Sequence, residues 1–119
     1  MAIDPHALPT EYASPEDFWA AAIGLFGPTT DSWRFRCPVC GYVAEVREWR
    51  AVGAETSIAF SCVGRWREGS RRAFGGEGPG PCDYAGGGLF QVNPVTVRLP
   101  AEGRALMVFQ FAPTVEDEK

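Results

Sequence analysis

Apolar and polar residues alternate along this chain with two different periods, and the first clear period is helical. Bulky apolar side chains recur at the three- and four-residue spacing of one helix face: Phe18, Trp19, Ala22, Ile23 and Phe26. Ser14 stands before them as an N-cap, followed by Pro15 at the first helical position, and Gly27-Pro28 ends the run. The pattern predicts a helix over 15–26 whose apolar face belongs to the core.

Beyond this helix the period falls to two, as in half-buried strands. Trp33, Phe35 and Cys37 alternate with Arg34 and Arg36, which predicts one strand. Further extended segments are expected over 42–50, 56–62, 89–92, 95–99 and 104–111, with Ile58, Phe60 and Cys62 sharing one face. Turns are expected over 51–55 and 100–103. The fold class predicted is α+β, with one N-terminal helix packed on an antiparallel β-sheet.

The length of 119 residues fits a single domain with a core of its own. Residues 1–13 contain two prolines and no period, so we expect an N-terminal arm, held by Leu8 or Tyr12. The domain itself is expected over 14–112, with an Arg- and Gly-rich insertion at 63–81, and 113–119 is expected to be an acidic tail.

The net charge and its distribution along the chain limit which partners the protein can attract. The net charge of -4 and the pI of about 4.9 argue against attraction of nucleic acid by the whole surface. Residues 37–82 nevertheless carry six arginines against five glutamates, so a phosphate-binding surface would be local and would lie there. The chain start lacks the features of a signal peptide and no apolar run reaches the length of a membrane span, so we expect a cytoplasmic protein without membrane contact.

Four cysteines form the most specific motif of the chain. Cys37 and Cys40 stand in the sequence Cys-Pro-Val-Cys-Gly, and Cys62 and Cys82 follow singly. A two-residue gap lets one tight turn aim two sulfurs at one point, so we predict a structural Zn²⁺ bound by all four thiolates. A redox pair at Cys37 and Cys40 is weaker, because such a pair normally opens a helix and a strand follows here. Disulfides among the four cysteines, or a metal site in which His6 replaces one thiolate, would also be compatible with these residue types.

The segment Cys-Pro-Val-Cys-Gly-Tyr resembles the first knuckle of the zinc-ribbon family, and the resemblance spans about residues 33–84. It implies a structural zinc and a binding role, without naming a partner. The family usually has a second Cys-x-x-Cys, whereas here nineteen residues separate Cys62 from Cys82.

The insertion between these two cysteines carries the candidate partner-binding residues. Arginines and aromatic residues interleave along it: Arg65, Trp66, Arg67, Arg71, Arg72 and Phe74. Guanidinium groups match phosphates and carboxylates, and an indole beside them can stack on a base or anchor a protein interface. The plainer interpretation is a solvated loop with Trp66 packed into the core.

These observations favour a binding protein over an enzyme. His6 is the only histidine, and a site closed by four thiolates leaves no position for water. The leading hypothesis is a non-enzymatic zinc module that contacts nucleic acid, or a nucleic-acid-processing protein, through 65–74. The second is a small acidic inhibitor or accessory protein of the kind that phages and mobile elements encode, acting by protein–protein contact. The third is a structural subunit of a larger assembly, including a homo-oligomer, since the aromatic residues are many for a core of this size.

Overall fold

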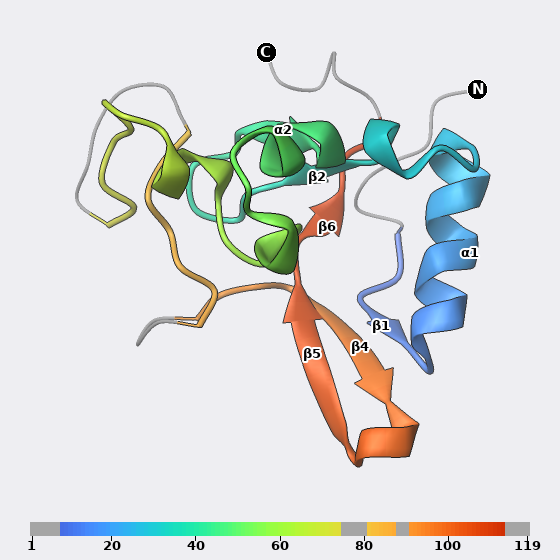
Figure 1. The fold of residues 1–119 in the computed structure, drawn as a ribbon. Helices are drawn as coiled ribbons and strands as arrows, with labels where there is room; N and C mark the ends of the chain where they lie inside the picture. Colours follow the sequence, from blue (N-terminus) through green and yellow to red (C-terminus); the bar gives the residue numbers. More distant parts are fainter. Residues whose placement is uncertain (1–7, 75–80, 88–90, 114–119) are drawn as a thin grey trace.

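The computed structural model describes residues 8–74, 81–87 and 91–113, and these form a mixed α+β fold (Figure 1). One sheet has the strand order β1-β4-β5, made of Glu11–Tyr12, Val95–Leu99 and Arg104–Val108. The other has the order β3-β2-β6, made of Val43–Glu45, Arg34–Arg36 and Gln110–Phe111. The α-helices are α1 (Pro15–Phe26) and α2 (Val46–Ala51), and four 3₁₀ helices span Thr30–Ser32, Glu55–Ser57, Val63–Trp66 and Pro100–Glu102. The α+β prediction is confirmed, although the single expected sheet is two.

Helix α1 begins and ends where the sequence predicts. The Ser14 side chain accepts a hydrogen bond from the backbone N–H of Asp17 at 3.1 Å, and Pro15 occupies the first turn. Gly27 ends the helix with φ 91° and donates its N–H to the carbonyl of Ile23. Within the described residues, no helix is long and apolar enough to span a membrane.

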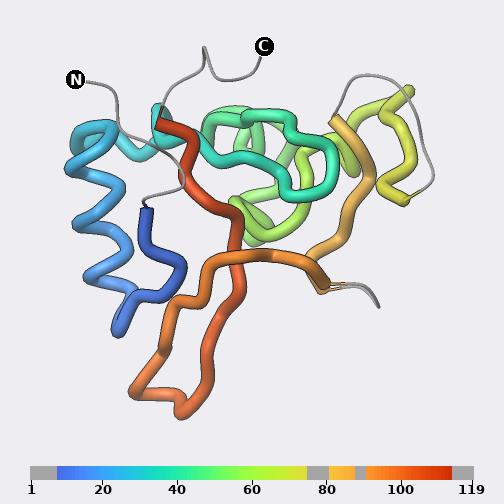
Figure 2. Tube along the Cα trace, turned by 180° about the vertical axis from the view of Figure 1, so that it is seen from behind, coloured from blue at the N-terminus to red at the C-terminus, as the bar shows by residue number. Residues whose placement is uncertain are grey.

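The β4–β5 hairpin projects from the body of the molecule, and both views place it between α1 and the insertion (Figures 1 and 2). Its antiparallel register pairs Val97 with Leu106, and its turn ends at Gly103 with φ 67°. Strand β1 pairs with β4 in parallel and buries Tyr12, so the end of the expected arm is part of a sheet.

The strand expected over 42–50 is correct only as far as Glu45. From Val46 the chain is helical, because the Glu48 carboxylate accepts the backbone N–H of Glu45 at 2.8 Å and caps the first turn of α2. Val46 and Trp49 then lie on the same buried side of this helix, three residues apart.

The strand expected over 56–62 is wrong, and so is the shared face of Ile58, Phe60 and Cys62. The backbone turns through a 3₁₀ helix, and Ala59 has φ 59°, which breaks any two-residue alternation. The backbone carbonyls here are bound by other parts of the chain instead of a neighbouring strand. The Trp49 indole donates to Ser61, and the Phe109 N–H donates to Ala59.

The hydrogen bond from the Phe109 N–H to the Ala59 carbonyl also divides the strand expected over 104–111. Residues 104–108 pair with β4, whereas 110–111 pair with β2 in the other sheet, and Phe109 lies between them. One stretch of chain therefore joins the two sheets. Of the strand expected over 89–92, residues 89 and 90 lie outside the described part of the chain, and 91–92 form no strand.

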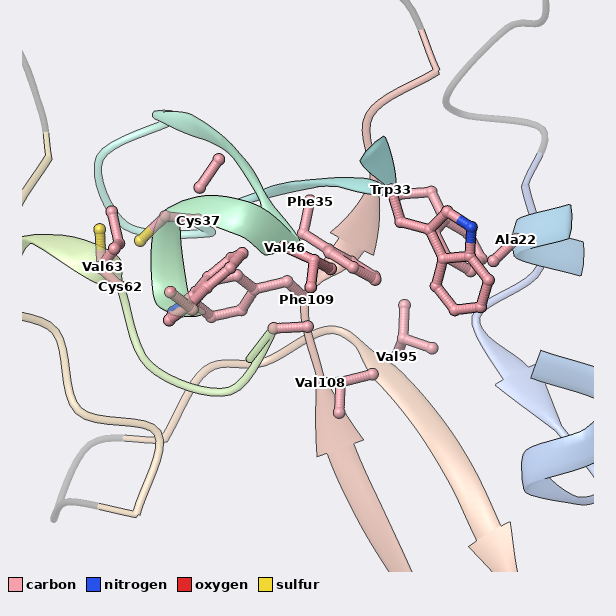
Figure 3. Packing of buried hydrophobic residues seen from close by; sticks show 14 of the residues in the cluster. Ala22, Trp33, Phe35, Cys37, Val46, Cys62, Val63, Val95, Val108 and Phe109 are labelled. Atoms are coloured by element: carbon pink, nitrogen blue, oxygen red, sulfur yellow. The ribbon is translucent and has the colours of Figure 1, made fainter. Parts of the chain in front are cut away.

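A line of aromatic rings runs through the core. Phe18 of α1 stacks on Phe111 at a centroid distance of 4.8 Å, and Phe111 contacts Phe35 at 5.3 Å. Trp49, which is fully buried, connects Phe35 to Phe109. Figure 3 shows this core continuing from Trp33 and Ala22 near α1 to Cys37 and Cys62. Cys37 and Cys62 thus lie at one end of the hydrophobic core.

Candidate metal centre

The four cysteine sulfurs converge on one point. Ligand atoms of Cys37, Cys40, Cys62 and Cys82 all lie within 4.8 Å of one another. The Cys37 and Cys82 sulfurs are 3.9 Å apart, and those of Cys40 and Cys62 are 3.8 Å apart. In a tetrahedron with Zn–S bonds of about 2.3 Å the sulfurs are separated by about 3.8 Å. The spacing therefore fits a tetrahedral metal ion, and all four cysteines are free of disulfides.

The first two ligands come from the turn between β2 and β3. The N–H of Val39 points at the Cys37 sulfur and the N–H of Tyr42 at the Cys40 sulfur, both at 3.4 Å. Gly41, with φ 80°, makes this turn possible and donates to the carbonyl of Cys37. Amides that point at sulfurs stabilise thiolates, which are the form that binds metal.

The other two ligands come from segments that are distant in sequence and in direct contact. The backbone N–H of Cys82 points at the Cys62 sulfur at 3.4 Å, and the N–H of Cys62 donates to the carbonyl of Tyr84. Gly64 allows this contact, because an added Cβ would lie 2.2 Å from the carbonyl oxygen of Cys82. This second half is therefore built from two crossing segments, with Cys62 preceding a 3₁₀ helix and Cys82 forming an isolated bridge to Arg71.

The proton affinities of the thiols follow from this crowding. Hydrogen bonds from Cys37 and Cys62 lower the pKa of Cys40 to about 2, while the hydrogen bond with Cys40 raises the pKa of Cys37. Burial raises the pKa of Cys82 to about 12. Without a cation, Cys37, Cys62 and Cys82 therefore favour the protonated thiol. A divalent ion would replace these protons and neutralise thiolates that burial otherwise disfavours.

The structure bears differently on three interpretations of the cysteines: a shared metal site, a redox pair, and a site with His6 as a ligand. The sulfur cluster brings together all four predicted ligands, so the metal site as a constellation is supported. Cys37 and Cys40 open a strand, β3, rather than a helix, so no helix N-terminus lowers the pKa of either thiol. His6 lies outside the described residues, and its expected role as a substitute ligand stays untested.

The insertion follows Cys62 of the cluster directly, and Arg67, a predicted contact residue, is bound to other parts of the domain. Arg67 donates to the Glu48 carboxylate at 2.9 Å and to the Tyr42 hydroxyl at 3.3 Å. The Tyr42 hydroxyl in turn donates to Glu48 at 2.7 Å. Because the other oxygen of Glu48 caps α2, this carboxylate ties together the insertion, the helix and the residue that follows Gly41.

Of the other predicted contact residues, Arg71 forms a backbone hydrogen bond, and the remaining four have exposed side chains. Arg71 donates its N–H to Pro81 beside Cys82, so its backbone is part of the site's frame. Arg65, Trp66, Arg72 and Phe74 are exposed, with 37% of Trp66 and 51% of Phe74 accessible. The Arg65 guanidinium lies over the Trp66 ring at 5.2 Å, and Phe74 meets Tyr84 edge-on. Trp66 is thus at the surface rather than packed into the core.

Sequence reasoning missed three residues that support the centre: Tyr42, Glu48 and Gly64. Glu48 had a local signal, because Glu45 and Glu48 have the spacing of a capping box. Tyr42 follows the knuckle directly, but its partners lie six and twenty-five residues away. Nothing local distinguishes Gly64 from other glycines.

Comparison with known proteins gives one positive finding. No curated protein and no solved structure matches the chain significantly. A family model, described as VVA0879-like, matches residues 14–112. This range covers α1, every strand except β1, and all four cysteines, so the chain belongs to the VVA0879-like family.

Proposed function

We propose that this protein is a non-enzymatic zinc-binding module that contacts a macromolecular partner through the exposed side chains of its insertion. The observation that carries the proposal is that the insertion is attached to the domain at both ends and at Arg67. Cys62 and Cys82 hold its two ends at the metal centre, and Arg67 ties its first half to Glu48. The contact set is Arg65, Trp66, Arg72 and Phe74, and Arg67 belongs to the frame.

Zinc is the ion that best suits the donor set. Four sulfur ligands in tetrahedral spacing favour zinc or iron, and hard cations such as magnesium and calcium prefer oxygen. Four thiolates also fill the coordination shell of zinc, which supports a structural role and leaves no open position for a water or a substrate. The resemblance of Cys-Pro-Val-Cys-Gly-Tyr to a zinc-ribbon knuckle adds to this.

The chemistry of the exposed side chains suits single-stranded nucleic acid first. Bases stack on indole and phenyl rings regardless of sequence, and guanidinium groups donate to the phosphates beside them. The same side chains could anchor a protein interface, in which Trp and Arg contribute most of the binding energy. The dependence on salt separates the two, because displacement of counterions from nucleic acid gives a steep linear loss of affinity with log salt.

Fluorescence anisotropy with labelled single-stranded DNA and RNA oligonucleotides tests the proposal on the zinc-loaded full chain. We compare the wild type with the triple variant Arg65→Ala, Trp66→Ala, Arg72→Ala. The matched control is Arg98→Ala with Arg104→Ala, which removes the same charge from the β4–β5 hairpin. We expect saturable binding that the triple variant loses by at least tenfold and that the control retains.

Two results would reject parts of this proposal. If the folded triple variant binds oligonucleotides as tightly as the wild type, the insertion is not the contact surface. If neither protein binds any oligonucleotide, nucleic acid is excluded, and binding to a co-purified protein that needs the same four side chains would then carry the function. Native mass spectrometry, with one zinc expected per chain, tests the metal independently.

A further inference from the structure

An apolar cavity opens away from the cysteine centre, between α1, α2 and the β4–β5 hairpin. Its volume is about 380 Å³, within the range typical of small-molecule sites. Large apolar side chains line most of it: Phe18, Trp19, Trp33, Phe35, Leu99 and Leu106. No lining residue is a cysteine or belongs to the insertion. The cavity is therefore a second feature of the fold, independent of the proposed function.

The mouth of the cavity leaves bulky apolar side chains in contact with water. Half of Trp19 and 37% of Leu106 are exposed, and both line the cavity. Leu106 pairs with buried Val97 across the hairpin, on the face that lines the cavity. Trp19 of α1 lines the same cavity. An indole and a leucine in the lining of one open apolar space form a site for a flat or branched apolar group.

The polar groups in the wall are few, and its one charged group is already paired. Among the lining residues the only charged one is Arg50, and Thr30 adds a hydroxyl group. The Arg50 guanidinium is bound by the Asp31 carboxylate and lies 3.7 Å from that of Glu55. An anionic ligand would have to compete with two carboxylates for this one cation, so the wall does not favour an anion.

The rest of the mouth adds further negative charge. Arg104 lies on the same hairpin face as Leu106 and is bound by Glu102 at 2.8 Å. Glu16 lies one helical turn before Trp19 and is exposed. Asp31 and Glu55 bind the lining residue Arg50, and Glu16 lies in sequence between the lining residues Pro15 and Phe18. These three carboxylates lie beside the cavity against the one guanidinium group of Arg50, while Arg104 and Glu102 neutralise each other. The electrostatic balance favours a cation, and the exposed face of Trp19 can bind one by cation–π interaction.

We infer that this cavity binds a small hydrophobic cation, that is, an aromatic or branched aliphatic amine. The apolar body of the ligand lies between Trp19 and Leu106 and fills the space above Phe35 and Val108. The ammonium group stays at the mouth, between the Glu16 carboxylate and the Trp19 ring, where it remains partly hydrated. The class of ligand follows from the apolar wall and the acidic mouth together, since either alone would fit other molecules.

A pair of isosteric probes tests this inference on the metal-loaded full chain. The cationic probe is 1-naphthylmethylammonium and the anionic probe is 1-naphthylacetate, and both are titrated while ¹H–¹⁵N spectra are recorded. The indole N–H signals of Trp19 and Trp33 report binding, and Trp33 is held in place by a hydrogen bond to Gly27 at 2.9 Å. We expect saturable shifts of these signals with the cation at least fivefold tighter than the anion at low salt, and a smaller ratio at high salt.

Two matched pairs of variants locate the site. Leu106→Arg should weaken the cationic probe at least tenfold, whereas Val92→Arg places the same charge on a residue that is 45% exposed and does not line the cavity. Glu16→Gln should reduce the preference for the cation without abolishing binding, whereas Glu68→Gln, on the insertion, should not.

Three results would overturn the inference. They are the absence of saturable binding, equal or tighter binding of the anionic probe, and equal effects of Leu106→Arg and Val92→Arg. The remaining alternative is that a second copy of the chain occupies the cavity, and analytical sedimentation of the wild type tests it. If the protein dimerises and Leu106→Arg abolishes the dimer, the cavity is an interface between copies and not a ligand site.

Discussion

Replacing Gly64 by alanine is the sharpest test of how the metal centre is assembled. The added Cβ would lie 2.2 Å from the Cys82 carbonyl oxygen and 2.9 Å from the Cys82 nitrogen. Ordinary contact begins at 3.4 Å, and the obstructing atoms are backbone, so no side-chain rotation relieves the clash. The segment that carries Cys82 must move by about 1.2 Å, several times the ~0.2 Å tolerance of a metal–ligand bond.

The expected magnitude has two parts. Overfilling a well-packed site costs about 1–3 kcal/mol, which lowers Tm by roughly 4–12 °C in a domain of this length. Displacement of the Cys82 sulfur weakens zinc binding further, by at least about tenfold, or 1.4 kcal/mol. Competition with a chromophoric chelator measures the affinity, and thermal unfolding followed by circular dichroism, with equimolar zinc, measures the stability.

Gly24 provides a matched control within the same chain. It lies on the exposed side of α1, and an added Cβ there meets nothing within 4 Å. Gly24→Ala should therefore raise Tm, because alanine favours the helix by about 1 kcal/mol, and should leave the zinc affinity unchanged. The reasoning is refuted if Gly64→Ala binds zinc like the wild type and unfolds at the same temperature.

Three further predictions follow from the described contacts. Zinc affinity should rise with pH, because Cys82, whose pKa burial raises to about 12, holds a proton that the metal must displace, and pH-independent binding in chelator titrations would contradict this. A double-mutant cycle of Glu48→Gln and Arg67→Met should give a coupling energy of about 1 kcal/mol in urea unfolding, since both side chains are partly buried, and zero coupling would show that the pair does not fix the insertion. Ser14→Ala should cost about 1 kcal/mol of stability through loss of the helix cap, measured by the same unfolding assay, with an unchanged midpoint as the contrary result.

The parts of the fold that sequence predicts well are those with local causes. The cap at Ser14 and the glycine at Gly27 act within one helical turn, and the hairpin turn at 100–103 depends on its own residues. The cysteine cluster is also predictable, because the Cys-Pro-Val-Cys spacing indicates that Cys37 and Cys40 share a metal and Cys62 and Cys82 are the only other cysteines in the sequence. The cluster in space agrees with that pattern.

The region from 46 to 62 is where sequence reasoning fails, and the causes are contacts with distant residues. Alternating apolar residues there suggested strands, but the carbonyl of Ala59 is bound by Phe109 and that of Ser61 by the Trp49 indole. Arg67 has the composition of a surface contact residue, and only its distance to Glu48, nineteen positions earlier, shows that it holds the insertion in place. A period of two cannot reveal such partners.

The cysteine cluster matters for the stability of the fold because the chain around it has little regular secondary structure. The described residues between Val52 and Asn93 contain only two short 3₁₀ helices and one isolated bridge, whereas α1 and the β4–β5 hairpin have regular hydrogen bonds of their own. The backbone around Cys62 and Cys82 is instead tied to the sulfur cluster and to Tyr84. Removal of the ion leaves crowded thiols at this end of the core, so the insertion should lose protection from hydrogen exchange before α1 does. A metal bound by the four cysteines would thus act in place of a sheet, because it would hold a segment that has few backbone hydrogen bonds of its own.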